Sequence, residues 1–314
     1  MKIVLILTAL VSLLFSAAMQ QPVKSYIAGG AVVDMVRAQG KLYVATDASS
    51  VDIFDLKSTK RIAQIKVDKI TDFMGDIIDS KIFSVDVYDG RVVLLSQGDK
   101  GYRRVHIYEA GKLQEIISIK DQLYIAQVKF LDKNRLMLAL LSDELIAYDI
   151  ATSKQLYRVA ASYSKFSNFA LDEKRELIVV ADESGVLKIH KTKDGSFVKE
   201  LKGQNLDNVF QVDIKNGVIA TAGQDRRAVI YNANSAYYMG SHFLIYAVGL
   251  SPSGRLAAYA SDEQNNVTLF KTGTKSVLAK YTGNKMTLVK IIFLDEKQFL
   301  VASDDRKINL YQIK

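Results

Sequence analysis

An aromatic residue ends one apolar run after another at nearly constant spacing along the chain. The runs read VDIF, VHIY, LIAY, LKIH, AVIY, VTLF and INLY, with histidine in the aromatic place of the fourth. Their last residues are Phe54, Tyr108, Tyr148, His190, Tyr231, Phe270 and Tyr311, at intervals of 54, 40, 42, 41, 39 and 41 residues. A period of about 40–45 residues is typical of a β-propeller, in which each repeat forms one four-stranded blade. The sequence therefore predicts an all-β propeller of seven blades, with these residues packed inside the blades.

Every repeat has the same internal order. A turn such as Gln39-Gly40 or Asn216-Gly217 separates a first strand, a, from a second strand, b, of small apolar residues. Gly and Asn suit such turns because they tolerate positive φ. The aromatic-ended run is strand c, and an alternating run such as RIAQI or VLAKY is strand d. We expect the small residues of strand b to border the crowded central channel.

The last repeat stops just after its strand c, at Tyr311, and lacks a strand d. Residues 22–28, which precede the first strand a, resemble the other d strands. We predict that this N-terminal strand completes the last blade. Such a closure removes the open edge of the ring, where an unpaired strand would invite aggregation.

The first interval is longer than the others. Residues 67–81 lengthen the connection between the first two blades, and residues 96–104 lengthen the b–c loop of the second. Insertions in a repeat array map to surface loops and are often where binding occurs. Aromatic and arginine side chains dominate interface energetics, so the candidate partner-binding residues are Phe73, Tyr102, Arg103 and Arg104. Replacing the two arginines by glutamate is expected to abolish partner capture without unfolding the protein.

The first residues read as a targeting segment. Lys2 precedes an apolar stretch over residues 3–15, and Ser16-Ala17-Ala18 offers small residues for cleavage before Met19. The sequence thus predicts a signal peptide over 1–18 and a single propeller domain over 19–314, located in the periplasm. An uncleaved membrane anchor and a cytosolic protein are the alternatives. No further stretch resembles a membrane span, and the absence of cysteine excludes disulfides and a lipoprotein anchor.

The chain is basic, with a formal charge of +8 and a pI near 9.3. In the cytosol this balance would suggest nucleic acid as a partner. An exported chain rarely meets nucleic acid, so an acidic protein partner or an anionic membrane surface fits better. We expect a monomer that binds a protein.

Residues typical of catalysis are few. The three histidines, His106, His190 and His242, fall in different blades, which argues against a histidine metal site. Carboxylate pairs such as Asp304-Asp305 fall in b–c turns, where Asp stabilises the local backbone. No phosphate loop, dinucleotide fingerprint or nucleophile elbow occurs in the sequence. We therefore expect no catalytic residue, metal or cofactor.

Two repeats resemble WD40-type propellers most closely. AGQDRRAVIYN, over residues 222–232, and ASDDRKINLY, over 302–311, match the family's turn aspartate six residues before an aromatic, at Asp225 and Asp305. Gly240-Ser241-His242, followed by Ser-Pro-Ser-Gly, resembles the family's Gly-His start. Every family tryptophan is replaced by Tyr, Phe or His. The resemblance implies a propeller in which these two aspartates, His242 and the strand-c residues hold the blades together.

Among exported, tryptophan-free propellers of about this length, the chain resembles the NapL-type accessory proteins encoded beside periplasmic nitrate reductase. The resemblance implies a non-enzymatic interaction factor whose partners are components of that reductase system. Two alternatives belong to other classes. An outer-membrane assembly scaffold would bind membrane β-barrels. A lactonase-like hydrolase would carry a metal in the central channel, held by acidic, Asn or His side chains from several blades.

Overall fold

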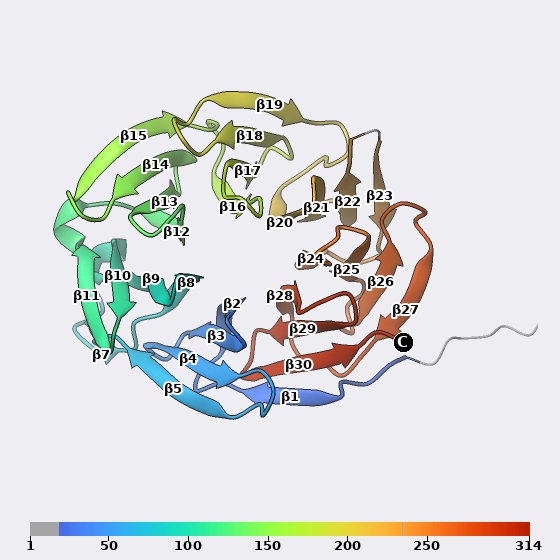
Figure 1. Cartoon of the computed structure of the whole chain (residues 1–314), viewed down its shortest axis with the longest axis horizontal. Helices are drawn as coiled ribbons and strands as arrows, with labels where there is room; N and C mark the ends of the chain where they lie inside the picture. The colour runs from blue at the N-terminus through green and yellow to red at the C-terminus, as the bar shows by residue number, and fades with distance from the viewer. Residues whose placement is uncertain (1–18, 234) are drawn as a thin grey trace, which may run out of the picture.

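The computed structural model describes residues 19–233 and 235–314, and its strands form seven four-stranded sheets arranged in a ring (Figure 1). The prediction of an all-β, seven-bladed propeller is confirmed. The signal peptide predicted over residues 1–18 lies outside the described residues. No helix in the described part of the chain is long and apolar enough to cross a membrane.

The first three blades follow one another along the chain. Blade 1 contains β2 (Val32–Ala38), β3 (Lys41–Thr46), β4 (Ser50–Asp55) and β5 (Arg61–Lys66). Blade 2 contains β8 (Ile82–Tyr88), β9 (Arg91–Gln97), β10 (Arg103–Glu109) and β11 (Lys112–Ile117). Blade 3 contains β12 (Ile125–Phe130), β13 (Arg135–Leu140), β14 (Glu144–Asp149) and β15 (Lys154–Ala160).

Blades 4 to 6 repeat this order. Blade 4 contains β16 (Phe166–Leu171), β17 (Leu177–Asp182), β18 (Leu187–Lys191) and β19 (Phe197–Leu201). Blade 5 contains β20 (Val209–Lys215), β21 (Val218–Gly223), β22 (Arg227–Tyr231) and β23 (Ala236–Gly240). Blade 6 contains β24 (Val248–Leu250), β25 (Leu256–Ala260), β26 (Val267–Lys271) and β27 (Val277–Tyr281).

Blade 7 joins the two ends of the chain. It contains β28 (Leu288–Phe293), β29 (Gln298–Ser303), β30 (Lys307–Gln312) and, as its outer strand, β1 (Lys24–Ile27). β1 runs antiparallel to β30, with Lys24 opposite Leu310 and Ile27 opposite Lys307. The N-terminal strand therefore completes the last blade, as predicted.

The insertion between blades 1 and 2 forms a short hairpin of β6 (Ile70–Thr71) and β7 (Ile77–Ile78). Two single turns of 3₁₀ helix, η1 (Asp99–Gly101) and η2 (Ile119–Asp121), lie in the b–c loop of blade 2 and in the connection to blade 3. All the insertions thus lie in loops, so the four-stranded order of the blades is kept.

Strand a, and not strand b, borders the central channel. Figure 1 shows β2, β8, β12, β16, β20, β24 and β28 around the centre of the ring. The expectation for strand b is wrong because b is the second strand of each sheet, hydrogen-bonded between a and c. Its small residues, such as Ala220 and Ala222, pack instead against neighbouring blades.

Tight turns and apolar contacts between blades follow from the repeat. Gln39-Gly40, Asp89-Gly90 and Asn216-Gly217 each place two successive residues at positive φ, the geometry of a two-residue hairpin turn. The core is divided into clusters that lie between blades. One of them brings Tyr26 and Leu300 of blade 7 against Met35 and Phe54 of blade 1.

Polar side chains on strand a link most blades to the next around the channel. In five of the junctions a side-chain oxygen accepts a backbone N–H of the following blade. These bonds are Asp34 with Val85, Asp86 with Phe130, Gln127 with Phe169, Asn168 with Val212, and Asp213 with Leu250. Between blades 6 and 7 the backbones approach each other closely instead. A Cβ added to Gly249 would lie only 2.6 Å from the Ile291 carbonyl oxygen. Arg37 closes the ring by donating to the Phe293 carbonyl at 3.1 Å.

Candidate functional site

The antiparallel order of the strands gives the ring two different faces. Strands a and c run in one direction and b and d in the other, so the b–c turns and the connections between blades lie on one face. We call this the b–c face, and the opposite one, with the a–b and c–d turns, the a–b face. The lengthened segments of the sequence all lie on the b–c face.

The β6–β7 hairpin presents apolar side chains to solvent on the b–c face. Phe73 is 95% exposed, Met74 73% and Ile77 75%, whereas Ile70 at its base is buried. The Asp72 carboxylate accepts the backbone N–H groups of Met74 at 2.8 Å and Asp76 at 2.9 Å. The tip is therefore held in a defined turn that keeps Phe73 and Met74 outside the fold.

The other residues predicted beside Phe73 are engaged within the fold. Arg103 stacks over the Phe83 ring at 3.9 Å and donates to the Gly101 carbonyl at 2.7 Å. Arg104 donates to the Asp68 carbonyl at 3.2 Å, and only 16% of its side chain is exposed. Charge reversal at both is thus expected to destabilise blade 2, contrary to the sequence-based expectation that the variant would stay folded.

Tyr102 packs on Tyr124, with ring centroids 4.9 Å apart. Tyr124 lies in the connection between blades 2 and 3 and is itself partly exposed. Further connections between blades expose large apolar side chains on the same face: Tyr163, Leu206 and Met286. Sequence reasoning missed these residues because each stands alone in a polar loop.

The strand-c residues lie inside the blades. Phe54, Tyr148, His190, Tyr231, Phe270 and Tyr311 are buried, and Tyr108 packs partly buried against the cluster between blades 1 and 2. In blade 5 the Tyr231 hydroxyl accepts a hydrogen bond from Asn205 at 3.1 Å, and Thr221 donates to Asn205 at 2.7 Å. A similar set in blade 7 joins Tyr311, Asn284 and Asn309. Both sets fix an interblade connection to its sheet.

The residues that carry the WD40 resemblance have different environments. Asp225 accepts the N–H of Leu206 at 2.8 Å and that of Arg227 at 3.1 Å, and Asp305 accepts the N–H of Lys307 at 2.7 Å. His242 is exposed, and no hydrogen bond joins its side chain to the described residues. Its neighbour Ser241 donates to the Ser261 carbonyl at 2.8 Å.

The remaining histidines are internal. His106 contacts the Ser96 hydroxyl at 3.0 Å. Burial lowers the pKa of His106 to about 4, helped by the positive charge of Arg104, so the ring is neutral at pH 7. His190 donates from Nδ1 to the Gly195 carbonyl at 2.9 Å and meets Phe197 edge to face. Within residues 19–233 and 235–314, no group of three or more His, Asp or Glu side chains is placed to hold a metal ion.

The central channel encloses a cavity of about 440 Å³, lined mainly by the a strands. Asp172 and Glu173, in the a–b turn of blade 4, line the cavity and accept backbone N–H groups. Three further carboxylates, on the a strands, each pair with a cation: Asp34 with Lys290 at 3.1 Å, Asp86 with Arg175 at 2.6 Å, and Asp213 with Lys215 at 3.3 Å. These carboxylates also accept the interblade N–H bonds described above. The three strand-a carboxylates are therefore bound both to cations and to the backbone of the next blade.

A buried pair of carboxyl groups joins blades 3 and 4. Asp143 is fully buried, and no donor of the described residues reaches either of its oxygens. Asp182 beside it is also buried but accepts from Ser184 and, at 3.0 Å, from Lys188. Burial raises the pKa of Asp143 to about 7, with the charge of Asp182 adding to the shift. Burial also disfavours ionisation of Asp182, but its hydrogen bonds outweigh that effect and lower its pKa.

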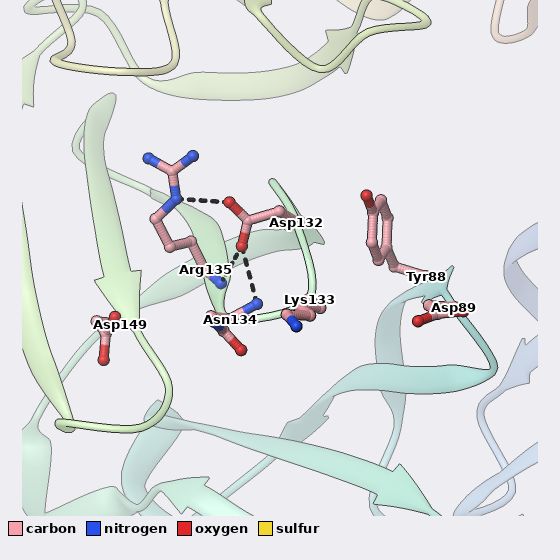
Figure 2. Close-up of a pocket in the computed structure, with 7 residues that line it drawn as sticks. All are labelled: Tyr88, Asp89, Asp132, Lys133, Asn134, Arg135 and Asp149. Atoms are coloured by element: carbon pink, nitrogen blue, oxygen red, sulfur yellow. Dashed lines mark hydrogen bonds and ion pairs between the residues drawn. The ribbon is translucent and has the colours of Figure 1, made fainter.

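The a–b face has an open depression of about 750 Å³ between blades 2 and 3. Figure 2 shows that Asp132 turns toward Arg135, whose Nε donates to it at 2.7 Å. Asp132 also accepts the backbone N–H of Asn134, and Asp149 accepts the N–H of Thr152. Asp132 and Asp149 therefore stabilise their own turns, whereas Asp89 is exposed.

The comparisons with known proteins establish the class of fold. No protein-family profile and no curated protein matches the sequence. Among solved structures, the β-propeller domain of Cps50 (Swd1) from Myceliophteria thermophila is similar, with a TM-score of 0.73 and 12% identity. The match covers 93% of this chain and 99% of that one. The chain is thus a seven-bladed propeller with a WD40-type structural neighbour, and at this identity the likeness concerns the fold alone.

Proposed function

We propose that this protein is an exported, non-enzymatic interaction module that serves as a NapL-type accessory factor of a periplasmic nitrate reductase system. The observation that carries the interaction role is the β6–β7 hairpin, which holds Phe73 and Met74 away from the core. An exposed cluster of apolar side chains on a soluble domain commonly marks an interaction site. Propellers suit this role because rigid sheets position their loops with little loss of order on binding.

The wider b–c face supports a protein partner. Tyr163, Leu206 and Met286 expose apolar surface on the same face as the hairpin. Large aromatic and methionine side chains are enriched at protein interfaces. The N-terminal sequence pattern supports export, and the resemblance to NapL-type proteins supports the reductase system as the partner.

The experiment is capture of partners from the periplasm of the producing bacterium by the tagged full-length chain. We expect reductase subunits or their maturation factors to be enriched in mass spectrometry, and the bait to begin at Met19 by intact mass. Phe73→Ser with Met74→Ser should lower the recovered partner by at least about tenfold, since two anchors of roughly 1 kcal/mol each are lost.

Leu156→Ser is the matched control, because Leu156 is 51% exposed but lies on the outer strand β15, away from the hairpin. It should leave capture unchanged. Enrichment of outer-membrane assembly proteins would contradict the reductase proposal and favour the scaffold alternative. Undiminished capture by the hairpin variant would show that the partner binds elsewhere on the molecule.

A further inference from the structure

The charged residues of the protein are distributed unequally between its two broad faces. Figure 1 views the ring down its shortest axis, so the a–b and b–c faces are the two large surfaces of the molecule. Counted over the a–b and c–d turns with the strand residue at each end, the a–b face has 18 Lys and Arg against 11 Asp and Glu. The b–c turns and the connections between blades, counted in the same way, have 13 against 17. The a–b face is therefore positive and the b–c face negative.

The lysines of the a–b face are able to meet an external charge. Lys57 and Lys60, in the c–d turn of blade 1, are both exposed. Lys191 and Lys193, in and beside the c–d turn of blade 4, are exposed as well. Within the part of the chain that the structure describes, none of these four side chains makes an ion pair. Their charges are thus not compensated by a carboxylate in direct contact.

The positive charge is spread around the ring and is not gathered in one groove. Each of the seven blades has at least one Lys or Arg in these turns or at their ends, from Lys41 in blade 1 to Lys297 in blade 7. Among the described residues, no large apolar side chain that is exposed lies within an a–b or c–d turn. Phe197 and Val277 border such turns, but they begin the outer strands β19 and β27 at the rim of the ring. Protein interfaces have apolar or aromatic anchors near their centre, and such anchors are missing from these turns.

We propose that the a–b face docks on an anionic lipid bilayer, with the plane of the ring parallel to the membrane. Anionic lipids present negative charge spread over a flat surface, which matches basic turns distributed around a whole face. The attraction grows with each Lys or Arg that lies within a Debye length of the lipid surface. The b–c face and its β6–β7 hairpin then point away from the membrane. This proposal does not depend on the partner proposed above, because a different face of the molecule carries it.

The test is flotation of residues 19–314 with lipid vesicles. This part of the chain contains every strand of the ring and lacks the apolar N-terminal stretch, which could bind lipid by itself. One set of vesicles contains equal parts of phosphatidylglycerol and phosphatidylcholine, and the other contains phosphatidylcholine alone. At an ionic strength of about 0.1 M, where the Debye length is about 10 Å, we expect at least about tenfold stronger binding to the anionic vesicles. At about 1 M, where the Debye length is about 3 Å, this binding should be lost.

A variant with four substitutions tests whether the a–b face makes the contact. It replaces four lysines by glutamine: Lys57, Lys60, Lys191 and Lys193. Because these side chains are exposed and unpaired, the variant should keep its fold, which circular dichroism checks. It should bind the anionic vesicles at least about tenfold more weakly than the unaltered chain, since each lysine contributes to the attraction.

The matched control removes the same number of charges from the b–c face. It replaces by glutamine four exposed lysines of that face: Lys100, Lys120, Lys202 and Lys285. It should bind the anionic vesicles as the unaltered chain does, because these residues point away from the membrane. Equal weakening in the two variants would overturn the proposal, since net charge and not one face would then govern binding. Binding of soluble polyglutamate without binding of anionic vesicles would also overturn it, and would favour an acidic protein as the partner of this face.

Discussion

At the scale of single residues, the buried carboxyl pair makes stability depend on pH. Folded Asp143 keeps its proton up to about pH 7, whereas an unfolded aspartate loses its proton near pH 4. Between these values the folded state binds more protons, so the free energy of unfolding falls as pH rises. The contribution of this group is therefore favourable in mild acid and is lost as pH passes through about 7.

Asp143→Asn should remove this dependence, because the amide is neutral at every pH and can donate to Asp182. We expect the variant to be more stable than the unaltered chain at pH 8 by at least about 1.4 kcal/mol, the equivalent of one pKa unit. Urea unfolding at pH 5.5 and pH 8 measures the difference. Asp89→Asn, in an exposed a–b turn, should change stability by less than about 0.5 kcal/mol. An unchanged pH slope in Asp143→Asn would contradict the assignment.

At the scale of elements, β1 is the strand that holds blade 7 to blade 1. Tyr26 is fully buried, meets Phe54 edge to face at 5.7 Å and donates to the Leu56 carbonyl at 2.9 Å. Its neighbour Ile27 points the other way and is 56% exposed. Because side chains alternate along a strand, these two neighbours provide one buried and one exposed position on β1. Both positions pair with β30 through the backbone.

Tyr26→Ala should lower the free energy of unfolding by about 3–5 kcal/mol, because it leaves a cavity between the two blades and an unpaired carbonyl. Ile27→Ala should cost less than about 1 kcal/mol, since the side chain is largely in solvent. Denaturant unfolding of both variants checks the difference. Equal losses would show that the pairing of β1, and not its packing against blade 1, holds the ring closed.

At the scale of the whole molecule, the sequence could predict the repeating blades but not the channel, which is formed by residues from several blades. The seven strand-c residues recur at a nearly constant spacing, and the last repeat has no strand d after Tyr311, so the sequence could predict the blades and the closing strand. The channel brings together residues far apart in the chain, such as Asp86 and Arg175, 89 residues apart. Only closure of the ring brings such residues into contact.

Because blade 7 contains strands from both ends of the chain, we expect the pairing of β1 with β30 to slow the unfolding of the ring. Moving residues 19–28 to follow Lys314 through a short turn would build blade 7 from one continuous segment, like the other six. The blades would remain, but no strand pairing would join the two ends of the chain, and contacts between blades 7 and 1, such as the hydrogen bond from the Val32 N–H to the Asp305 carbonyl, would hold the ring closed. We expect unchanged circular dichroism and unfolding that is faster by on the order of tenfold, because opening would no longer break the β1–β30 hydrogen bonds.

The matched control begins at Thr152 and ends at Ala151, with the native ends joined by a long flexible linker. Its break lies in the c–d turn of blade 3, so β15 and β14 would close the ring as β1 and β30 do in the native chain. This permutant should unfold as slowly as the native protein. If the first permutant also unfolds at the native rate, the shared blade is not what keeps the ring closed, and contacts between blades suffice.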